Sequence, residues 1–92
     1  MKFLLDVNIL VAWGWLDHSE HRRVARWVGD MMAKRNVTLF TSAIPELGFV
    51  RVSVQRATGR LTVEEAAESL ADMLKSLGRR HRFLADDLSS LS

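Results

Sequence analysis

Short apolar runs alternate with longer amphipathic segments along the chain. The runs at residues 2–5, 37–40 and 81–84 are brief and lack a helix start signal, which is typical of buried strands. Between them, apolar residues recur at helical spacing over residues 8–16, from residue 20 to Met32, from Ser42 onward, and from residue 63 to Leu77. The order strand, helices, strand, helices, strand predicts an α/β fold with a short parallel sheet covered by helices.

Capping residues set the expected helix ends. Asp17 with Glu20 forms a candidate capping pair for the second helix, and Thr62 with Glu65 forms a capping box for the fourth, which Gly78 ends. The third helix is expected to open at Thr41 or Ser42. Its predicted buried stripe consists of Ile44, Leu47, Val50 and Val54.

Composition narrows the class of protein. The 92 residues predict one small domain, and the absence of cysteine excludes disulfides and zinc–thiolate sites and favours the cytoplasm. The longest uncharged stretch, residues 7–16, is shorter than the roughly 20 residues that span a bilayer. A net charge of +2 is too small to identify a nucleic-acid binder, although ten of the thirteen basic residues are arginine.

Two acidic residues follow the first two predicted strands. Asp6 ends the first strand, and Glu46 lies early in the helix after the second. Since ligands of parallel sheets bind at the carboxyl ends of strands, both carboxylates are expected at one edge. Paired carboxylates suit Mg²⁺ or Mn²⁺, with Asn8 steadying the site. The alternative is structural: Asp6 as a helix cap and Glu46 as a complement to a helix dipole.

Three segments carry a family resemblance: DVNILVAWGWLDHSEHRRVARWV, TSAIPELGFVRVSV and HRFLADDLS. Together they resemble the PIN-domain ribonucleases, specifically the VapC-type toxins of prokaryotic toxin–antitoxin pairs. The resemblance implies a three-layer α/β/α fold and a Mg²⁺-dependent endoribonuclease, inhibited by a cognate antitoxin. It also makes Asp6 and Glu46 metal-binding catalytic residues, supported by Asn8. Ser42 matches a small hydroxyl residue of the family, and we expect a structural cap there. We also expect a homodimer.

The sequence departs from this family toward its C-terminus. Relatives continue past the third strand into a helix with a third acid, commonly in a motif such as T-D-A-Y-L, and often have a fourth acid later. Neither is among these 92 residues. Asp86 and Asp87 are candidate substitutes, although a turn role is the simpler interpretation. The alternative hypothesis is therefore a truncated, catalytically inactive PIN-like remnant that only dimerises or binds an antitoxin.

A basic run, Arg79 to Arg82, precedes and enters the third predicted strand. Two interpretations remain for this run: its side chains contact phosphate, or they belong to a solvated turn. The three tryptophans, Trp13, Trp15 and Trp27, are spaced for burial in helices, which favours a core or interface role over stacking on RNA.

Overall fold

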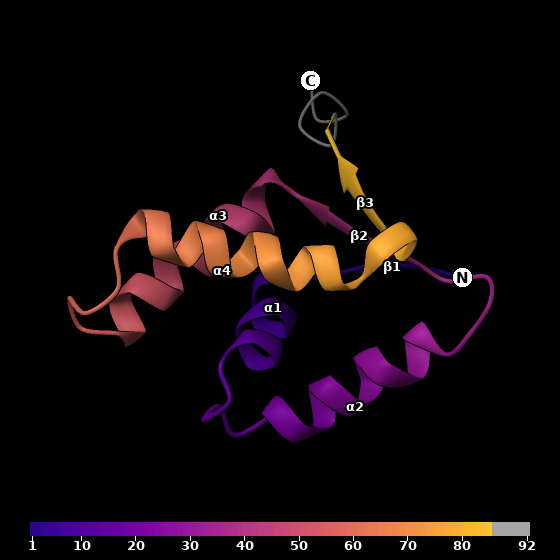
Figure 1. The fold of residues 1–92 in the computed structure, drawn as a ribbon, viewed down its shortest axis with the longest axis horizontal. Coiled ribbons are helices and arrows are strands. Elements are labelled where there is room, and N and C mark those ends of the chain that lie inside the picture. Colours follow the sequence, from indigo (N-terminus) through magenta and orange to yellow (C-terminus); the bar gives the residue numbers. More distant parts are fainter. Residues whose placement is uncertain (86–92) are drawn as a thin grey trace.

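A computed structural model describes residues 1–85 of the chain. Within them, four α-helices and a three-stranded parallel sheet are arranged as shown in Figure 1. The elements are β1 (Lys2–Leu4), α1 (Val7–Gly14), α2 (His21–Met32), β2 (Thr38–Ser42), α3 (Ala43–Arg56), α4 (Val63–Ser76), the 3₁₀ turn η1 (Gly78–Arg80) and β3 (His81–Leu84). The predicted α/β class and the order of its elements are confirmed.

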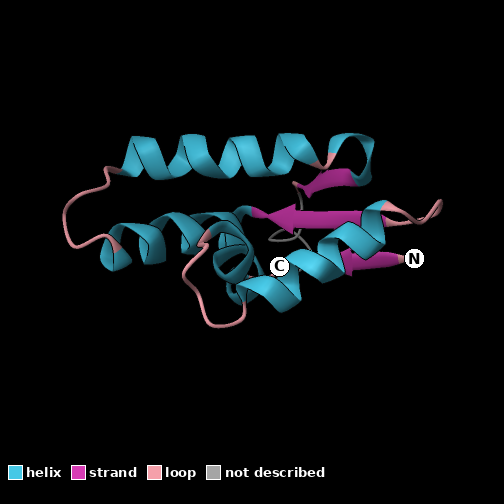
Figure 2. Cartoon of the chain, turned by 60° about the horizontal axis from the view of Figure 1, so that its bottom comes forward, coloured by secondary structure: helices cyan, strands magenta, loops and turns pink. Residues whose placement is uncertain are grey.

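The sheet has the order β1-β2-β3, with β2 in the centre. Leu4 of β1 is paired with Phe40, and Ser42 at the end of β2 is paired with Leu84 of β3. Figure 2 shows the three strands side by side. All three strands run in the same direction, so their carboxyl ends form one edge of the sheet and their amino ends form the opposite edge.

The core lies where the sheet meets the helices. Leu5, Leu10 and Leu39 are completely buried, and Phe49 and Leu77 nearly so. The tryptophans are partly buried against this cluster, as the sequence predicts. Trp27 meets Phe3 edge to face, with ring centroids 5.4 Å apart, and the Trp15 indole donates a hydrogen bond of 2.9 Å to Ser53 Oγ.

The predicted buried stripe of α3 is wrong at its first two positions, although Val50 packs against the core. Ile44 and Leu47 are 59% and 66% exposed, whereas Pro45, Phe49 and Ser53 are buried. These buried positions recur every four residues, so the core side of α3 is rotated from the predicted side. Tertiary contacts with α1 set this rotation. Such contacts cannot be predicted from the hydrophobicity of the residues in α3 alone.

The predicted start of α2 is also wrong. Asp17 is paired with Arg56 on α3 at 3.1 Å and does not cap the helix. Glu20 occupies the N-cap position without a side-chain capping bond. Instead, the Glu20 amide donates to His18 Nδ1 at 3.0 Å in the preceding turn. A long-range ion pair thus replaces the predicted local contact.

The predicted start and end of α4 are confirmed. Thr62 Oγ1 accepts from the Glu65 amide at 3.0 Å, and the Glu65 carboxylate accepts from the Thr62 amide at 2.9 Å. Gly78 follows the helix with φ of +59°, a left-handed conformation that glycine adopts at little cost. In the described part of the chain, no helix is both long and apolar enough to cross a membrane.

Candidate active site at the carboxyl edge of the sheet

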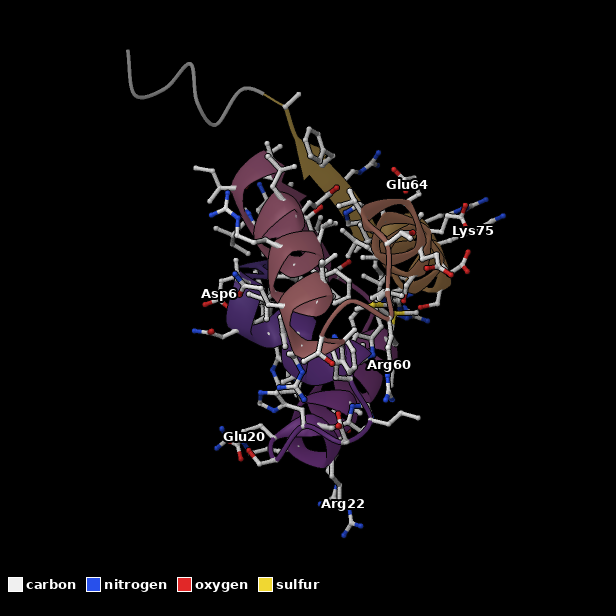
Figure 3. All side chains as sticks on the ribbon, turned by 90° about the vertical axis from the view of Figure 1, so that its left-hand side faces the viewer. Asp6, Glu20, Arg22, Arg60, Glu64 and Lys75 are labelled. Carbon is white, nitrogen blue, oxygen red and sulfur yellow. The ribbon has the colours of Figure 1, made fainter. Side chains whose placement is uncertain are left out.

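Asp6 lies just beyond β1, at the N-cap of α1. Its Oδ1 accepts a hydrogen bond of 2.9 Å from the Ile9 amide, so the predicted capping role is present. The side chain is exposed at the surface of the molecule (Figure 3). The cap uses only Oδ1. The cap does not involve Oδ2, so Asp6 can cap the helix and bind a ligand at the same time.

Glu46 lies in the first turn of α3, directly after β2. Its Oε2 is held by Thr41, whose hydroxyl donates to it at 2.6 Å. Thr41 is fully buried and belongs to β2, which extends two residues beyond its predicted end. The hydroxyl thus fixes a half-buried carboxylate near the positive end of a helix, where negative charge is favoured.

His81, the first residue of β3, completes a chain of hydrogen bonds. Its Nε2 lies 2.6 Å from Thr41 Oγ1. A hydroxyl has one proton, and an ionised carboxylate only accepts, so Thr41 donates to Glu46 and accepts the Nε2–H of His81. Burial lowers the pKa of His81 below its usual 6.5, with the negative charge of Glu46 acting in the opposite direction. A neutral ring that carries its proton on Nε2 fits this pattern.

Sequence reasoning assigned no part of this network to Thr41 beyond a possible cap, and it assigned no site role to His81. The sequence signal that indicates both residues is a polar side chain in, or directly after, an otherwise apolar predicted strand. β2 and β3 are parallel, and His81 is paired with Leu39. Thr41 lies two residues after Leu39, on the same face of the sheet, so Thr41 and His81 are diagonal neighbours.

Asp6 and Glu46 are at the same edge of the sheet but open onto different hollows. Asp6 and Asn8 line a hollow of about 250 Å³, and Asp6 with Ser42 lines a second of about 280 Å³. Glu46 and His81 line a third, of about 520 Å³, between α3, α4 and β3. Ile44 and Pro45 line the second hollow with Asp6, and Glu46, the next residue of α3, lines the third.

Asn8 and Ser42 lie where the sequence places them, on α1 and at the N-cap of α3, and each lines a hollow with Asp6. Asn8 is exposed on α1, and the hydrogen bond to Asp6 comes from the Ile9 amide rather than from Asn8. Ser42 occupies the N-cap position of α3 by its backbone, without a side-chain capping bond. Asp86 and Asp87, the candidate substitutes for a third acid, lie outside the described residues.

The chemistry of Asp6 and Glu46 fits a hard divalent cation, because carboxylate oxygens are its preferred ligands and Mg²⁺ needs only one or two of them. The described residues contain no group of three or more histidine or acidic side chains arranged to hold a metal ion. Asp6 and Glu46 alone would therefore be only part of a ligand set for such an ion.

Comparison with known proteins gives relatives along nearly the whole chain. Ribonuclease VapC38 of Mycobacterium tuberculosis is 39% identical over 88 residues, which is 94% of this chain and 59% of the relative. Ribonuclease VapC39 of the same organism is 34% identical over 90 residues, 96% of this chain and 61% of the relative. Ribonuclease VapC44 of this organism is 34% identical over 92 residues, which is 99% of this chain and 61% of the relative. Over nearly its whole length the chain is similar in sequence to these three ribonucleases.

The predicted resemblance to VapC-type PIN-domain ribonucleases is therefore confirmed. The chain spans about three fifths of the length of these VapC relatives. No protein-family model matches it. No solved structure matches it either.

Proposed function

We propose that the protein is a VapC-type toxin, a Mg²⁺- or Mn²⁺-dependent endoribonuclease that hydrolyses RNA phosphodiesters. The observation that carries this proposal is the position of two carboxylates, Asp6 and Glu46, after adjacent parallel strands in a chain homologous to proteins named ribonucleases. We also propose a cytoplasmic site of action, since the sequence contains no cysteine.

In this proposal Asp6 and Glu46 hold the metal ion and Asn8 supports the site. When bound, the ion supplies positive charge that stabilises negative charge developing on the phosphodiester. Asp6 offers the oxygen that its cap leaves free. Glu46 is kept in place by Thr41, and Thr41 is kept in place by His81. Glu46 is thus held in position by hydrogen bonds, whereas Asp6 is exposed.

Four exposed apolar side chains lie around this edge: Leu4, Ile44, Leu47 and Phe83. Each is about half exposed or more, which is unfavourable for a surface open to water. Leu47 and Phe83 line the same apolar hollow as Glu46. We propose that a cognate antitoxin covers this surface and thereby blocks the site, and that the protein forms a homodimer.

Cleavage of labelled RNA by the purified chain tests the enzymatic proposal. We expect cleavage with Mg²⁺ or Mn²⁺, its loss with EDTA, and its loss in Asp6→Asn, which keeps a side chain able to cap α1. Equal cleavage by this variant and the original chain would contradict the assignment of Asp6.

One observation favours a second candidate function, that of an inactive binding protein. The described residues supply two carboxylates where the family resemblance implies three or four. In that case the chain binds antitoxin or a second copy without cleaving RNA. Binding with no metal-dependent cleavage, at protein concentrations where a full-length relative cleaves, would identify this function.

A further inference from the structure

A basic hollow lies at the opposite edge of the sheet from Asp6 and Glu46. It has a volume of about 470 Å³ and forms where the strands begin. Four cationic side chains line it: Lys2 at the start of β1, Arg35 in the loop between α2 and β2, and Arg79 and Arg80 in η1. No acidic residue is among those lining it. The whole chain has a net charge of only +2, so this concentration of positive charge is local.

These cations lack carboxylate partners in the described part of the chain. The two ion pairs there join Arg23 to Glu20 and Arg56 to Asp17, both distant in sequence from the hollow. Uncompensated charge in a concave surface focuses the electrostatic field and attracts anions. The charge of the hollow is therefore available to a ligand.

Arg80 organises the hollow. One of its guanidinium nitrogens donates to the carbonyl oxygen of Lys34, which ties η1 to the loop between α2 and β2. The same contact brings Arg35 and Arg79 to the walls of one hollow, although they are far apart in sequence. Arg80 Nε is buried without a hydrogen-bond partner among the described residues.

We propose that this basic hollow binds the phosphodiester backbone of RNA, as a second contact separate from the site of cleavage. Three of the four cations are arginines, whose planar forks match phosphate oxygens. The hollow has few apolar side chains, so an acidic amphipathic peptide would find no place for its apolar residues. It contains no aromatic residue on which a base could stack, so binding is independent of RNA sequence.

The distance between the two edges suits one RNA molecule. They are separated by β2, whose four residue steps from Thr38 to Ser42 span about 13 Å at roughly 3.3 Å each. RNA held in the basic hollow can thus reach Asp6 and Glu46, and the inference rests on the proposed function for the identity of the ligand.

Binding of fluorescent single-stranded RNA, measured by anisotropy in EDTA at several salt concentrations, tests this inference. The variant is R35E/R79E, which reverses two exposed charges and keeps Arg80. The matched control is R22E/R26E, with the same charge change on exposed residues of α2; Arg22 extends into solvent away from the sheet (Figure 3). Circular dichroism checks that both fold, and R35A/R79A is a milder second variant.

We expect R35E/R79E to weaken binding about tenfold more than the control. We also expect R35A/R79A to lower the salt slope, log K against log salt, by about 1.4, since each lost contact with a single strand removes about 0.7. Equal losses in the hollow variant and the control would overturn the inference. So would displacement of labelled RNA by polyglutamate as effectively as by unlabelled RNA, which would assign the hollow to acidic peptides.

The measurement separates this inference from the proposed function. EDTA prevents metal-dependent cleavage, so the affinity does not depend on the site at the other edge. Loss of binding in R35E/R79E, with no cleavage by the original chain in Mg²⁺, would contradict only the nuclease proposal. Cleavage by the original chain, with equal binding by the two charge-reversed variants, would contradict only the basic hollow.

Discussion

Gly48 of α3 lies against Val7 of α1 so closely that a Cβ at position 48 would stand 2.4 Å from Val7 Cγ2. Val7 is the residue after Asp6, and Gly48 is two residues after Glu46. The contact therefore joins the two segments that carry the candidate metal ligands. It also fixes the rotation of α3 that buries Phe49 and exposes Leu47.

Gly48→Ala is expected to destabilise the protein, because the added methyl group overlaps Val7. Overpacking of this kind typically costs about 1–3 kcal/mol of unfolding free energy. Chemical denaturation measures it. Gly29→Ala is the matched control: nothing lies within 4 Å of its Cβ position in α2, so the better helix former is expected to stabilise by up to about 1 kcal/mol.

A double variant decides whether Val7 is the cause. In V7A/G48A the overlapping methyl groups of valine are absent, so the combined loss should be smaller than the sum of the two single losses by at least about 0.5 kcal/mol. Strict additivity would show that Gly48 matters for another reason.

Thr41→Val should weaken metal binding while keeping the shape of the side chain. It leaves Glu46 Oε2 and His81 Nε2 without the hydroxyl that joins them. Loss of such a supporting hydrogen bond typically lowers metal affinity about 10- to 100-fold. Calorimetry with Mn²⁺ measures this, and Thr41→Ser, which keeps the hydroxyl, should recover most of the affinity. No recovery in the serine variant would limit Thr41 to a packing role.

His81 is expected to titrate below 6.5, because burial disfavours its charged form. The unfolded chain then binds more protons, so the contribution of His81 to the unfolding free energy is complete above pH 6.5 and declines as the pH falls toward the folded pKa. NMR titration of the ring protons measures the pKa. Glu46→Gln should lower it further, since the carboxylate opposes the effect of burial. A rise in Glu46→Gln would refute the coupling.

Thr62→Ala tests the start of α4. It removes the side-chain half of the capping box, a loss worth about 1 kcal/mol of unfolding free energy in a typical helix. Thermal and chemical denaturation measure it, and Thr62→Ser should retain most of the stability. A loss of the same size in both variants would show that the methyl group, and not the hydroxyl, is what matters.

The sequence predicted the features that depend on local physics. The Thr62–Glu65 box and Gly78 act within one or two turns, and the three apolar runs became strands in the predicted order. The positions of Asp6 and Glu46 after neighbouring strands follow from that order alone.

The features that sequence could not predict depend on contacts between distant segments. Asp17 meets Arg56 across 39 positions, and this long-range pair replaces the predicted cap. Phe49 is buried because α1 sets the rotation of α3. Thr41 and His81, 40 positions apart, become a site pair only through the register of β2 and β3.

Mn²⁺ binding to four forms of the chain tests the central claim most directly: that Asp6 and Glu46 share one ion. The forms are the original chain, Asp6→Asn, Glu46→Gln and the double variant, compared by calorimetry or electron paramagnetic resonance. We predict one bound ion, weakened by each single variant, with a coupling of at least about 0.5 kcal/mol between them in the double-variant cycle. Unchanged affinity in either single variant, or independent and additive losses, would contradict the claim.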